Sequence, residues 1–309
     1  MDRYPDESFG EDRVNRQDRP VLTIVSVLYG GHEVLEKTLA TWRASIDSSI
    51  EVVFVDHSPT SMAEVLDLSW ARHEWNPDNP GFAAGVNRAV ELANSGHIFL
   101  LNPDVFLTPT ALARIASAKV TGPAAIALRT GGVEHSGIEY SRWGFCRDRV
   151  DVGRHLVGAS GGAALFPRHL VHEQIPFPEH LFAWGEDAEW SLWLISNGIE
   201  TTEIGDVILD HVGGHSVSSS AGQRLKARLL VRNRIATFRR ALSRGTKVRI
   251  GVPFFAAIAA NGARKVAQGV GWSYLQGIVE GLRMEVPPRL GAPIAWPLWK
   301  TLTERSQRR

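Results

Sequence analysis

The strongest constraint on the fold is an alternation of short apolar runs with segments of helical periodicity. The runs cover residues 21–29, 51–56 and 97–104, and their length and β-branched content predict buried strands. Residues 32–45 have apolar side chains at helical spacing, and residues 79–96 predict a loop entering a helix that a glycine ends. This alternation predicts an α/β protein whose mostly parallel sheet is covered by helices on both faces.

The remaining segments are assigned by simpler patterns. Residues 1–20 lack a periodic apolar pattern and are expected to form a disordered tail. Residues 131–168 are rich in glycine and short apolar runs, which favours additional mixed strands. Residues 185–197 predict a helix, and residues 206–216 a short strand followed by a glycine-rich loop. From residue 223 we expect helices to the end, with turns at Gly245, at 251–253 and at 287–288.

Cysteine content and charge limit the surroundings of the chain. The single cysteine, Cys146, allows no internal disulfide and favours a reducing, cytoplasmic compartment. The N-terminus has no apolar segment typical of a signal peptide, and no apolar run approaches the roughly 20 residues that span a bilayer. From Gly222 to Arg309 there are 18 Lys and Arg against three acids. This excess suggests an anionic partner, nucleic acid or a membrane surface, but solvated helix faces would explain it equally well.

The predicted strand ends supply candidate ligand-binding residues, because ligands of open parallel sheets bind at the carboxyl ends of the strands. The first strand ends at Tyr29 and two glycines, and no dinucleotide-binding glycine motif follows it, which argues against an NAD enzyme. Asp56 could accept hydrogen bonds from a nucleobase or a sugar, or could bond its own backbone in a turn. Asp104 could hold Mg²⁺ or Mn²⁺ with a diphosphate, or could cap the next helix, where Thr108 is an equally good cap.

Two further segments combine small or polar residues. Residues 158–167, which include Gly161 and Gly162, contain enough small side chains to let the backbone approach a ligand, or simply form a turn. His211 and His215 flank two glycines, and an imidazole there could complete a metal site or bond a phosphate. Histidines at such positions are also often structural.

Three acids, Glu186, Asp187 and Glu189, lie among indole rings in the sequence AWGEDAEW. In the first turn of a helix, each acid would gain about 0.3–1 kcal/mol from the helix dipole, which also lowers the pKa of a carboxylate and weakens it as a base. That explanation leaves Trp184 and Trp190 unaccounted for. Flat aromatic faces are natural platforms for the C–H surfaces of sugars, and a weak base here could still deprotonate a hydroxyl late in a reaction.

The order of these motifs resembles the family 2 inverting glycosyltransferases. The matching stretches are VSVLYGG, VVFVDHS, NPDNPGFAAGVNRAV, LLNPDV, FPEHLFAWGEDAEW and DHVGGHSVS, and together they span about residues 21–240. The sequence is most similar to the rhamnosyltransferase-like branch, which builds bacterial surface polysaccharides. The resemblance implies a GT-A fold, an αβα sandwich with a nucleotide-sugar half (residues 21–105) and an acceptor half (residues 106–240). Residues 241–309 form a helical extension outside it.

The resemblance also implies roles for individual residues. Asp187 would be the catalytic base, with Glu186 beside it, and Asp104 with His211 would hold Mg²⁺ or Mn²⁺. The nucleotide-sugar would be bound by Tyr29, Asp56, Asn79, Gly81, Phe82, Gly85, Asn87, Asn102 and Asp104, with Asp56 on the base. We expect the acceptor to contact Trp184, Trp190, Gly161 and Gly162.

Some positions depart from the family pattern. His57 stands where asparagine is usual, and Glu189 and Trp193 stand where aspartate and arginine are usual. These changes keep the expected base but leave the acceptor and the donor sugar open. The expected reaction is transfer of a hexose, rhamnose by analogy, from a dTDP- or UDP-sugar to a glycan or polyprenyl-diphosphate-linked hydroxyl.

Other functions and partners were weighed. A nucleotidyltransferase would need Arg and Lys in the loop after the first strand, where this chain has none before Lys37. A non-catalytic nucleotide-sugar-binding or assembly subunit would keep Asp56 and Asp104 but could lose the base. No nucleic-acid-binding motif is present. The C-terminal aromatic residues, Trp272, Tyr274, Trp296 and Trp299, suit the cytoplasmic leaflet, or packing on the core or on a second copy.

Overall fold

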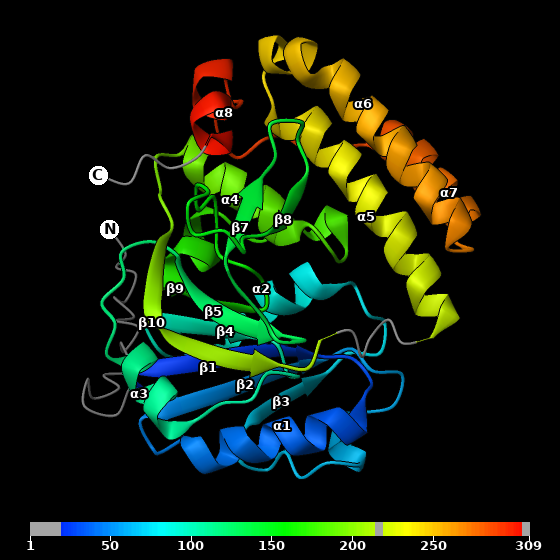
Figure 1. The fold of residues 1–309 in the computed structure, drawn as a ribbon. Helices are drawn as coiled ribbons and strands as arrows, with labels where there is room; N and C mark the ends of the chain where they lie inside the picture. The colour runs from blue at the N-terminus through cyan, green and yellow to red at the C-terminus, as the bar shows by residue number, and fades with distance from the viewer. Residues whose placement is uncertain (1–19, 214–218, 305–309) are drawn as a thin grey trace, which may run out of the picture.

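The computed structural model describes residues 20–213 and 219–304. The predicted tail, apart from Pro20, and His215 lie outside these ranges. Within them, a central sheet carries helices on both faces, and a layer of long helices lies beside it (Figure 1). No helix among the described residues is both long enough and apolar enough to cross a bilayer.

The central sheet has eight strands in the order β10-β5-β9-β4-β1-β2-β3, with β6 paired to β5 beyond the residues that pair with β9. Their bounds are Leu22–Leu28 (β1), Ile50–Asp56 (β2), Arg72–Trp75 (β3), His97–Leu101 (β4), Ala124–Thr130 (β5), Val133–Ser136 (β6), Ala163–Pro167 (β9) and Thr202–His211 (β10). Neighbouring strands are parallel except where β9 and β6 pair. The prediction of a mostly parallel sheet is therefore confirmed, although β3 and β5 were not anticipated.

Helices cover both faces of the sheet, as predicted. Helices α1 (His32–Ser45) and α3 (Pro109–Ala116) bury Leu35, Trp42 and Ile115 against one face. Helices α2 (Phe82–Leu92) and α4 (Glu186–Ser196) bury Val86 and Trp190 against the other. Helix α2 ends at Leu92, before the glycine expected to stop it, whereas Thr108 caps α3 as expected. Short helical turns lie at Met62–Glu64, Leu170–Gln174 and Glu179–Leu181.

The antiparallel strand β9 determines where the glycine-rich turn lies. Its first residue, Ala163, pairs with Leu101, the last residue of β4. The turn before β9 is tied to the same place, because the Asn102 backbone N–H donates to the Gly162 carbonyl at 2.9 Å. Residues 158–162 therefore lie at the carboxyl end of β4, where a parallel sheet binds its ligands.

The last third of the chain forms a helical layer that shares a hydrophobic core with the hairpin β7 (Ile138–Tyr140) and β8 (Cys146–Asp148). The helices are α5 (Ser220–Ala241), α6 (Arg244–Ala267), α7 (Gly271–Arg283) and α8 (Trp296–Thr303). Phe254 of α6 stacks on Phe238 of α5 with ring centroids 4.2 Å apart. Tyr274 and Trp299 are buried in this core, so they belong to the packing and are not available to a membrane.

Helix α6 corrects the turns expected at Gly245 and at 251–253. It runs unbroken through both glycines and Pro253. The Ser243 side chain caps its first turn, and Ile250, Phe254 and Ile258 bury one face in the helical-layer core. This packing outweighs the helix-breaking propensities of glycine and proline.

Candidate active site

A cleft of about 1000 Å³ opens at the carboxyl ends of β1, β4, β5 and β10, and residues of α5 and the β7–β8 hairpin line its other side. Most of the predicted site residues line it. They are Tyr29, Asn79, Phe82, Asn102, Asp104, Gly161, Gly162, Trp184, Glu186, Asp187 and His211. Motifs separated by more than 180 residues in sequence thus meet in one cavity.

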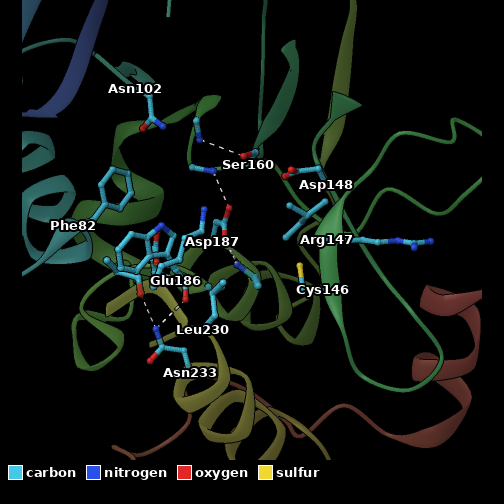
Figure 2. A pocket seen from close by; sticks show the side chains of 18 of the residues that line it. Phe82, Asn102, Cys146, Arg147, Asp148, Ser160, Glu186, Asp187, Leu230 and Asn233 are labelled. Carbon is cyan, nitrogen blue, oxygen red and sulfur yellow. Dashed lines mark hydrogen bonds between the residues drawn. The ribbon is translucent and has the colours of Figure 1, made fainter. Parts of the chain in front are cut away.

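The paired acids Glu186 and Asp187 begin helix α4, as the sequence predicted. Asp187 accepts two backbone hydrogen bonds, from the Gly161 N–H at 3.0 Å and from the Ala188 N–H at 2.7 Å. In Figure 2, Asp187 points toward the turn that contains Ser160, and Cys146 and Asp148 of β8 lie across the cleft. The carboxylate is therefore held in one orientation at the cleft surface.

Burial changes the acid–base properties of this pair. Desolvation, together with the charge of Asp187, raises the pKa of Glu186 to about 8. Desolvation also raises the pKa of Asp187, against the opposing effect of its hydrogen bonds from Gly161 and Ala188. The lowered pKa expected from the helix dipole is therefore wrong, because burial outweighs it. Since Asp187 accepts two N–H bonds and Glu186 Oε2 is buried without a partner, the pair at neutral pH consists of ionised Asp187 and protonated Glu186.

The loop that leads into these acids is strained. Phe182, Trp184 and Gly185 have φ values of 65°, 64° and 109°, in a region that non-glycine residues rarely adopt. The buried side-chain amide of Asn233, on α5, donates to the carbonyls of Leu181, Ala183 and Trp184 at 2.8–2.9 Å. Figure 2 shows Asn233 below the loop, pointing toward these carbonyls. Arg232 also donates to the Leu181 carbonyl, at 2.6 Å, so two neighbouring side chains of α5 hold the backbone that presents Glu186 and Asp187.

A second contact ties the same loop to the other half of the cleft. The Phe82 N–H donates to the Phe182 carbonyl at 2.7 Å. Gly81 has a φ of 107°, and a Cβ there would lie 2.5 Å from the Phe182 oxygen, so the close approach requires glycine. The segment at residues 79–82 is therefore fixed against the loop that carries the acids.

Helix α4 is anchored to α5 by the third acid of the cluster. Glu189 is fully buried and accepts hydrogen bonds from Arg240 at 2.6 Å and from Thr237 at 2.8 Å. This buried ion pair accounts for the presence of an acid at position 189, and Glu189 does not line the cleft. It fixes the rotation of α4 and hence the side from which Asp187 enters the cavity.

Asp104 and His211 form the second polar centre. His211 Nε2 lies 3.0 Å from Asp104 Oδ1, and the Gly213 N–H donates to Asp104 Oδ2 at 3.1 Å. Thr130 Oγ1, 3.0 Å from His211 Nδ1, orients the ring. One carboxylate and one imidazole suit Mn²⁺ or Mg²⁺ that shares its remaining ligands with a diphosphate. No group of three ligating side chains occurs among the described residues, so this donor set fits only a metal completed by substrate.

Asp56, which the resemblance assigned to the nucleobase, does not line the cleft. Its carboxylate is fully buried and accepts from the Ser58 and Met62 N–H groups at 2.9 and 2.6 Å, with His73 Nε2 3.2 Å away. These contacts make Asp56 the turn residue that the sequence left as its alternative. The next residue, His57, lines the cleft in its place, with Nδ1 3.1 Å from the Asn76 carbonyl and Nε2 buried without a partner.

Three other predicted contacts are structural, and none of these residues lines the cleft. Gly85 makes room for His57, since a Cβ would lie 2.8 Å from Nε2. Asn87 bonds the backbone N–H and carbonyl of Phe177. Trp190 is buried, stacks on Phe177 at 4.4 Å and donates to the Ile175 carbonyl, so it has no ring face to offer an acceptor.

Cationic side chains on the α5 side of the cleft were not predicted. Arg234 lines the cleft with its guanidinium 4.3 Å from the Phe145 ring centroid, and burial lowers its pKa. Lys226 lines it as well, 6.0 Å from the Trp184 ring. The available signal in the sequence was Asn233 next to Arg234 in the middle of α5. Asparagine is a poor helix former, so its presence inside a helix indicates a local role for this part of α5.

Comparisons with solved structures identify the fold. No protein-family model matches the sequence, and no curated protein sequence matches it. Mannosyltransferase PcManGT from Pyrobaculum calidifontis, solved with GDP-Man and Mn²⁺, is 16% identical with a TM-score of 0.53, over 86% of this chain and 88% of that one. TarS 1–349 from S. aureus is 14% identical with a TM-score of 0.51, over 85% and 81%.

GalNAc-T7, solved with UDP, GalNAc and Mn²⁺, gives a TM-score of 0.58 at 13% identity. That match covers 76% of this chain but only 50% of GalNAc-T7. At these identities the likeness concerns the fold alone. The chain therefore has the GT-A-like α/β fold, with C-terminal helices added to it.

Replacing Asn233 should release the strained loop. Asn233→Ala removes the side-chain donor to the Ala183 and Trp184 carbonyls and one of the donors to the Leu181 carbonyl, so we expect the free energy of unfolding to fall by about 1–3 kcal/mol. Asn233→Asp, similar in size but unable to donate when ionised, should be at least as damaging. Chemical denaturation measures both, with Gln223→Ala at an exposed position of α5 as the control. Wild-type stability in both Asn233 variants would mean that the loop holds its conformation without this amide.

The pKa of Glu186 predicts a dependence of stability on pH. The ordinary pKa of a glutamate is 4.5, and the pKa of Glu186 in the folded protein is about 8. Between these two pH values, Glu186 is ionised in the unfolded chain but keeps its proton in the folded protein. Below pH 4.5, Glu186 therefore does not reduce the free energy of unfolding. As pH rises from 4.5 toward 8, this group lowers the free energy of unfolding by about 1.4 kcal/mol per pH unit.

Glu186→Gln should remove this loss, so its stability should gain on wild type from pH 5 to pH 8. Urea denaturation across that range, with exposed Glu33→Gln as the control, provides the measurement. Parallel curves for wild type and Glu186→Gln would show that Glu186 ionises normally.

Proposed function

We propose that this chain is an inverting glycosyltransferase that uses a nucleotide-sugar donor. One observation carries the proposal: a single cleft contains the partly buried carboxylate Asp187 and the Asp104–His211 pair. The turn at Gly161–Gly162 links them, because Gly161 donates to Asp187 and the Gly162 carbonyl accepts from Asn102, next to Asp104 in the strand-end turn. The GT-A-like fold supports the class, since two of the compared proteins were solved with a nucleotide or nucleotide-sugar and Mn²⁺.

The chemistry proposed for Asp187 is general base catalysis. An acceptor hydroxyl attacks the anomeric carbon while the bond from that carbon to the diphosphate oxygen breaks. Asp187 takes the hydroxyl proton, and the diphosphate leaves with the electron pair of the broken bond. A single in-line displacement inverts the configuration. The raised pKa makes Asp187 a stronger base than an exposed aspartate, and its two backbone bonds fix its orientation.

Glu186 has a different part in this scheme. Because it holds a proton at neutral pH, it cannot serve as the base, and its neutrality keeps a second negative charge away from Asp187. The two neighbouring acids are thus distinguished by environment, as in other enzymes with paired carboxyl groups.

Asp104 and His211 would hold Mg²⁺ or Mn²⁺ together with the donor diphosphate. When bound, the metal supplies positive charge next to the leaving group. Around this point Tyr29, His57, Asn79, Phe82 and Asn102 line the cleft and are proposed to bind the nucleotide-sugar.

On the opposite side of the cleft, Trp184 offers a partly exposed ring for the acceptor, with Lys226 and Arg234 nearby on α5. The cations favour an acceptor that bears a negative group, such as a polyprenyl-diphosphate-linked glycan. We propose a dTDP- or UDP-sugar as donor, with L-rhamnose the first candidate by family resemblance. The corresponding pathway would be cytoplasmic synthesis of bacterial surface polysaccharide.

The alternative is a non-catalytic nucleotide-sugar-binding subunit. That function needs the Asp104 centre but has no use for a buried base. Retention of an oriented, partly desolvated Asp187 in the same cleft favours the enzyme.

The decisive variant is Asp187→Asn, which keeps the size of the side chain and removes the base. We would screen UDP-, dTDP- and GDP-sugars by thermal shift with Mn²⁺, Mg²⁺ or a chelator, and follow nucleotide release as turnover. Asp187→Asn should bind the same donor with metal but lose turnover by about 10²–10⁴-fold, whereas Glu186→Gln should retain most of it. Normal turnover by Asp187→Asn would refute the base, and donor binding without turnover in wild type, with acceptors supplied, would favour the binding subunit.

A further inference from the structure

Helix α7 packs with its small residues inward. It lies against α5, where a Cβ on Gly277 would be 2.1 Å from the Arg228 carbonyl oxygen and one on Gly281 would be 2.7 Å from that of Arg232. Glycine at both positions lets the two helix backbones approach closely. The buried side of α7 is therefore formed by these glycines and Tyr274.

As a result, the large apolar side chains of α7 face away from the protein. Trp272, Leu275, Val279 and Leu282 recur at helical spacing and are all exposed, Trp272 to 74%. A surface helix of a soluble domain normally has the opposite arrangement, with its apolar stripe against the core. Exposed apolar stripes of this kind mark interaction surfaces.

Helix α6, which packs beside α7 (Figure 1), has an exposed apolar stripe of its own. Val248 and Val252, one turn apart, are each 82% exposed, and Phe255 and Val266 are exposed along the same helix. We call these residues together with the α7 stripe the apolar face of α6 and α7. Its members are Val248, Val252, Phe255, Val266, Trp272, Leu275, Val279 and Leu282.

The charges around this apolar face are almost all positive. Arg249, Arg264 and Arg283 are exposed next to its members in the sequence, and Lys265 is partly exposed. The acids from Arg244 to Glu285 are Glu280, which pairs with Arg228 of α5 at 2.5 Å, and Glu285, which is exposed just after α7. Exposed tryptophan and aliphatic side chains interleaved with arginine match the apolar interior and anionic headgroups of a phospholipid surface.

We propose that the apolar face of α6 and α7 docks in the plane of an anionic phospholipid membrane. The charge pattern favours lipid over a second copy of this chain, because a symmetric contact through this face would bring the same unpaired cations together. The docked helices would hold α5 near the membrane surface, and α5 lines the cleft with Lys226 and Arg234. An acceptor attached to a membrane lipid could then reach the cleft. The membrane contact itself goes beyond the proposed transfer reaction and does not depend on it.

The test is flotation of the full chain with vesicles, which needs neither donor nor turnover. Wild type should float with vesicles of phosphatidylcholine and phosphatidylglycerol, and at least tenfold less with phosphatidylcholine alone. The double variant Val252→Glu/Trp272→Glu should lose flotation by at least tenfold. Val65→Glu, at an exposed valine outside the helical layer, is the matched control and should float as wild type does.

A second variant separates charge from apolar contact. Arg249→Gln/Arg264→Gln should weaken flotation with anionic vesicles and reduce its sensitivity to salt. Circular dichroism and thermal unfolding establish that each variant is folded.

Failure of folded wild type to float with anionic vesicles would overturn the proposal. So would a wild-type dimer in light scattering that the double variant converts to monomer without any vesicle binding, because a second copy would then occupy the face. Equal flotation with neutral vesicles would refute the role of the cations.

Discussion

The geometry of the candidate site depends on hydrogen bonds from α5 to the loop before α4, above all those from the buried amide of Asn233. Asn233 donates to three carbonyls of the loop before α4, and this loop contains two non-glycine residues with positive φ. A strained backbone of this kind persists only where its surroundings over-determine it. Asn233 from one side and the Phe82 N–H from the other provide that restraint. They hold the start of α4 so that Glu186 is buried and Asp187 is partly buried at the edge of the cleft.

This burial gives the two acids their different properties. A carboxyl group removed from water resists ionisation, and two adjacent carboxyl groups cannot both ionise without repulsion. Asp187 has backbone N–H partners that stabilise its charge, whereas Glu186 Oε2 has none, so the negative charge goes to Asp187. The sequence suggested a helix-dipole effect alone because it shows that the acids lie in a first turn. It cannot show the layer of α5 that excludes water from them.

Features that depend on local periodicity were predictable from sequence. The buried runs gave β1, β2 and β4, the helical spacing gave α1 and α4, and the carboxyl ends of the strands indicated the cleft. Contacts between distant segments were not predictable. Trp190 fills the core because it packs on Phe177 and donates to the Ile175 carbonyl, which the sequence does not place beside it, whereas the local turn of Asp56 was already one of its two predicted alternatives. The continuation of α6 through Pro253 was missed for the same reason, since tertiary packing overrides local propensity.

The central claim is that the proton of the buried pair lies on Glu186 and the charge on Asp187. Infrared difference spectroscopy at neutral pH tests it directly, because a buried protonated carboxyl group gives a C=O stretch distinct from that of a carboxylate. Comparing wild type with each single carboxyl-to-amide variant assigns the band. The account predicts one protonated-carboxyl band that disappears when Glu186 is replaced and remains when Asp187 is replaced. A band that disappears only when Asp187 is replaced would place the proton on the proposed base and contradict the account.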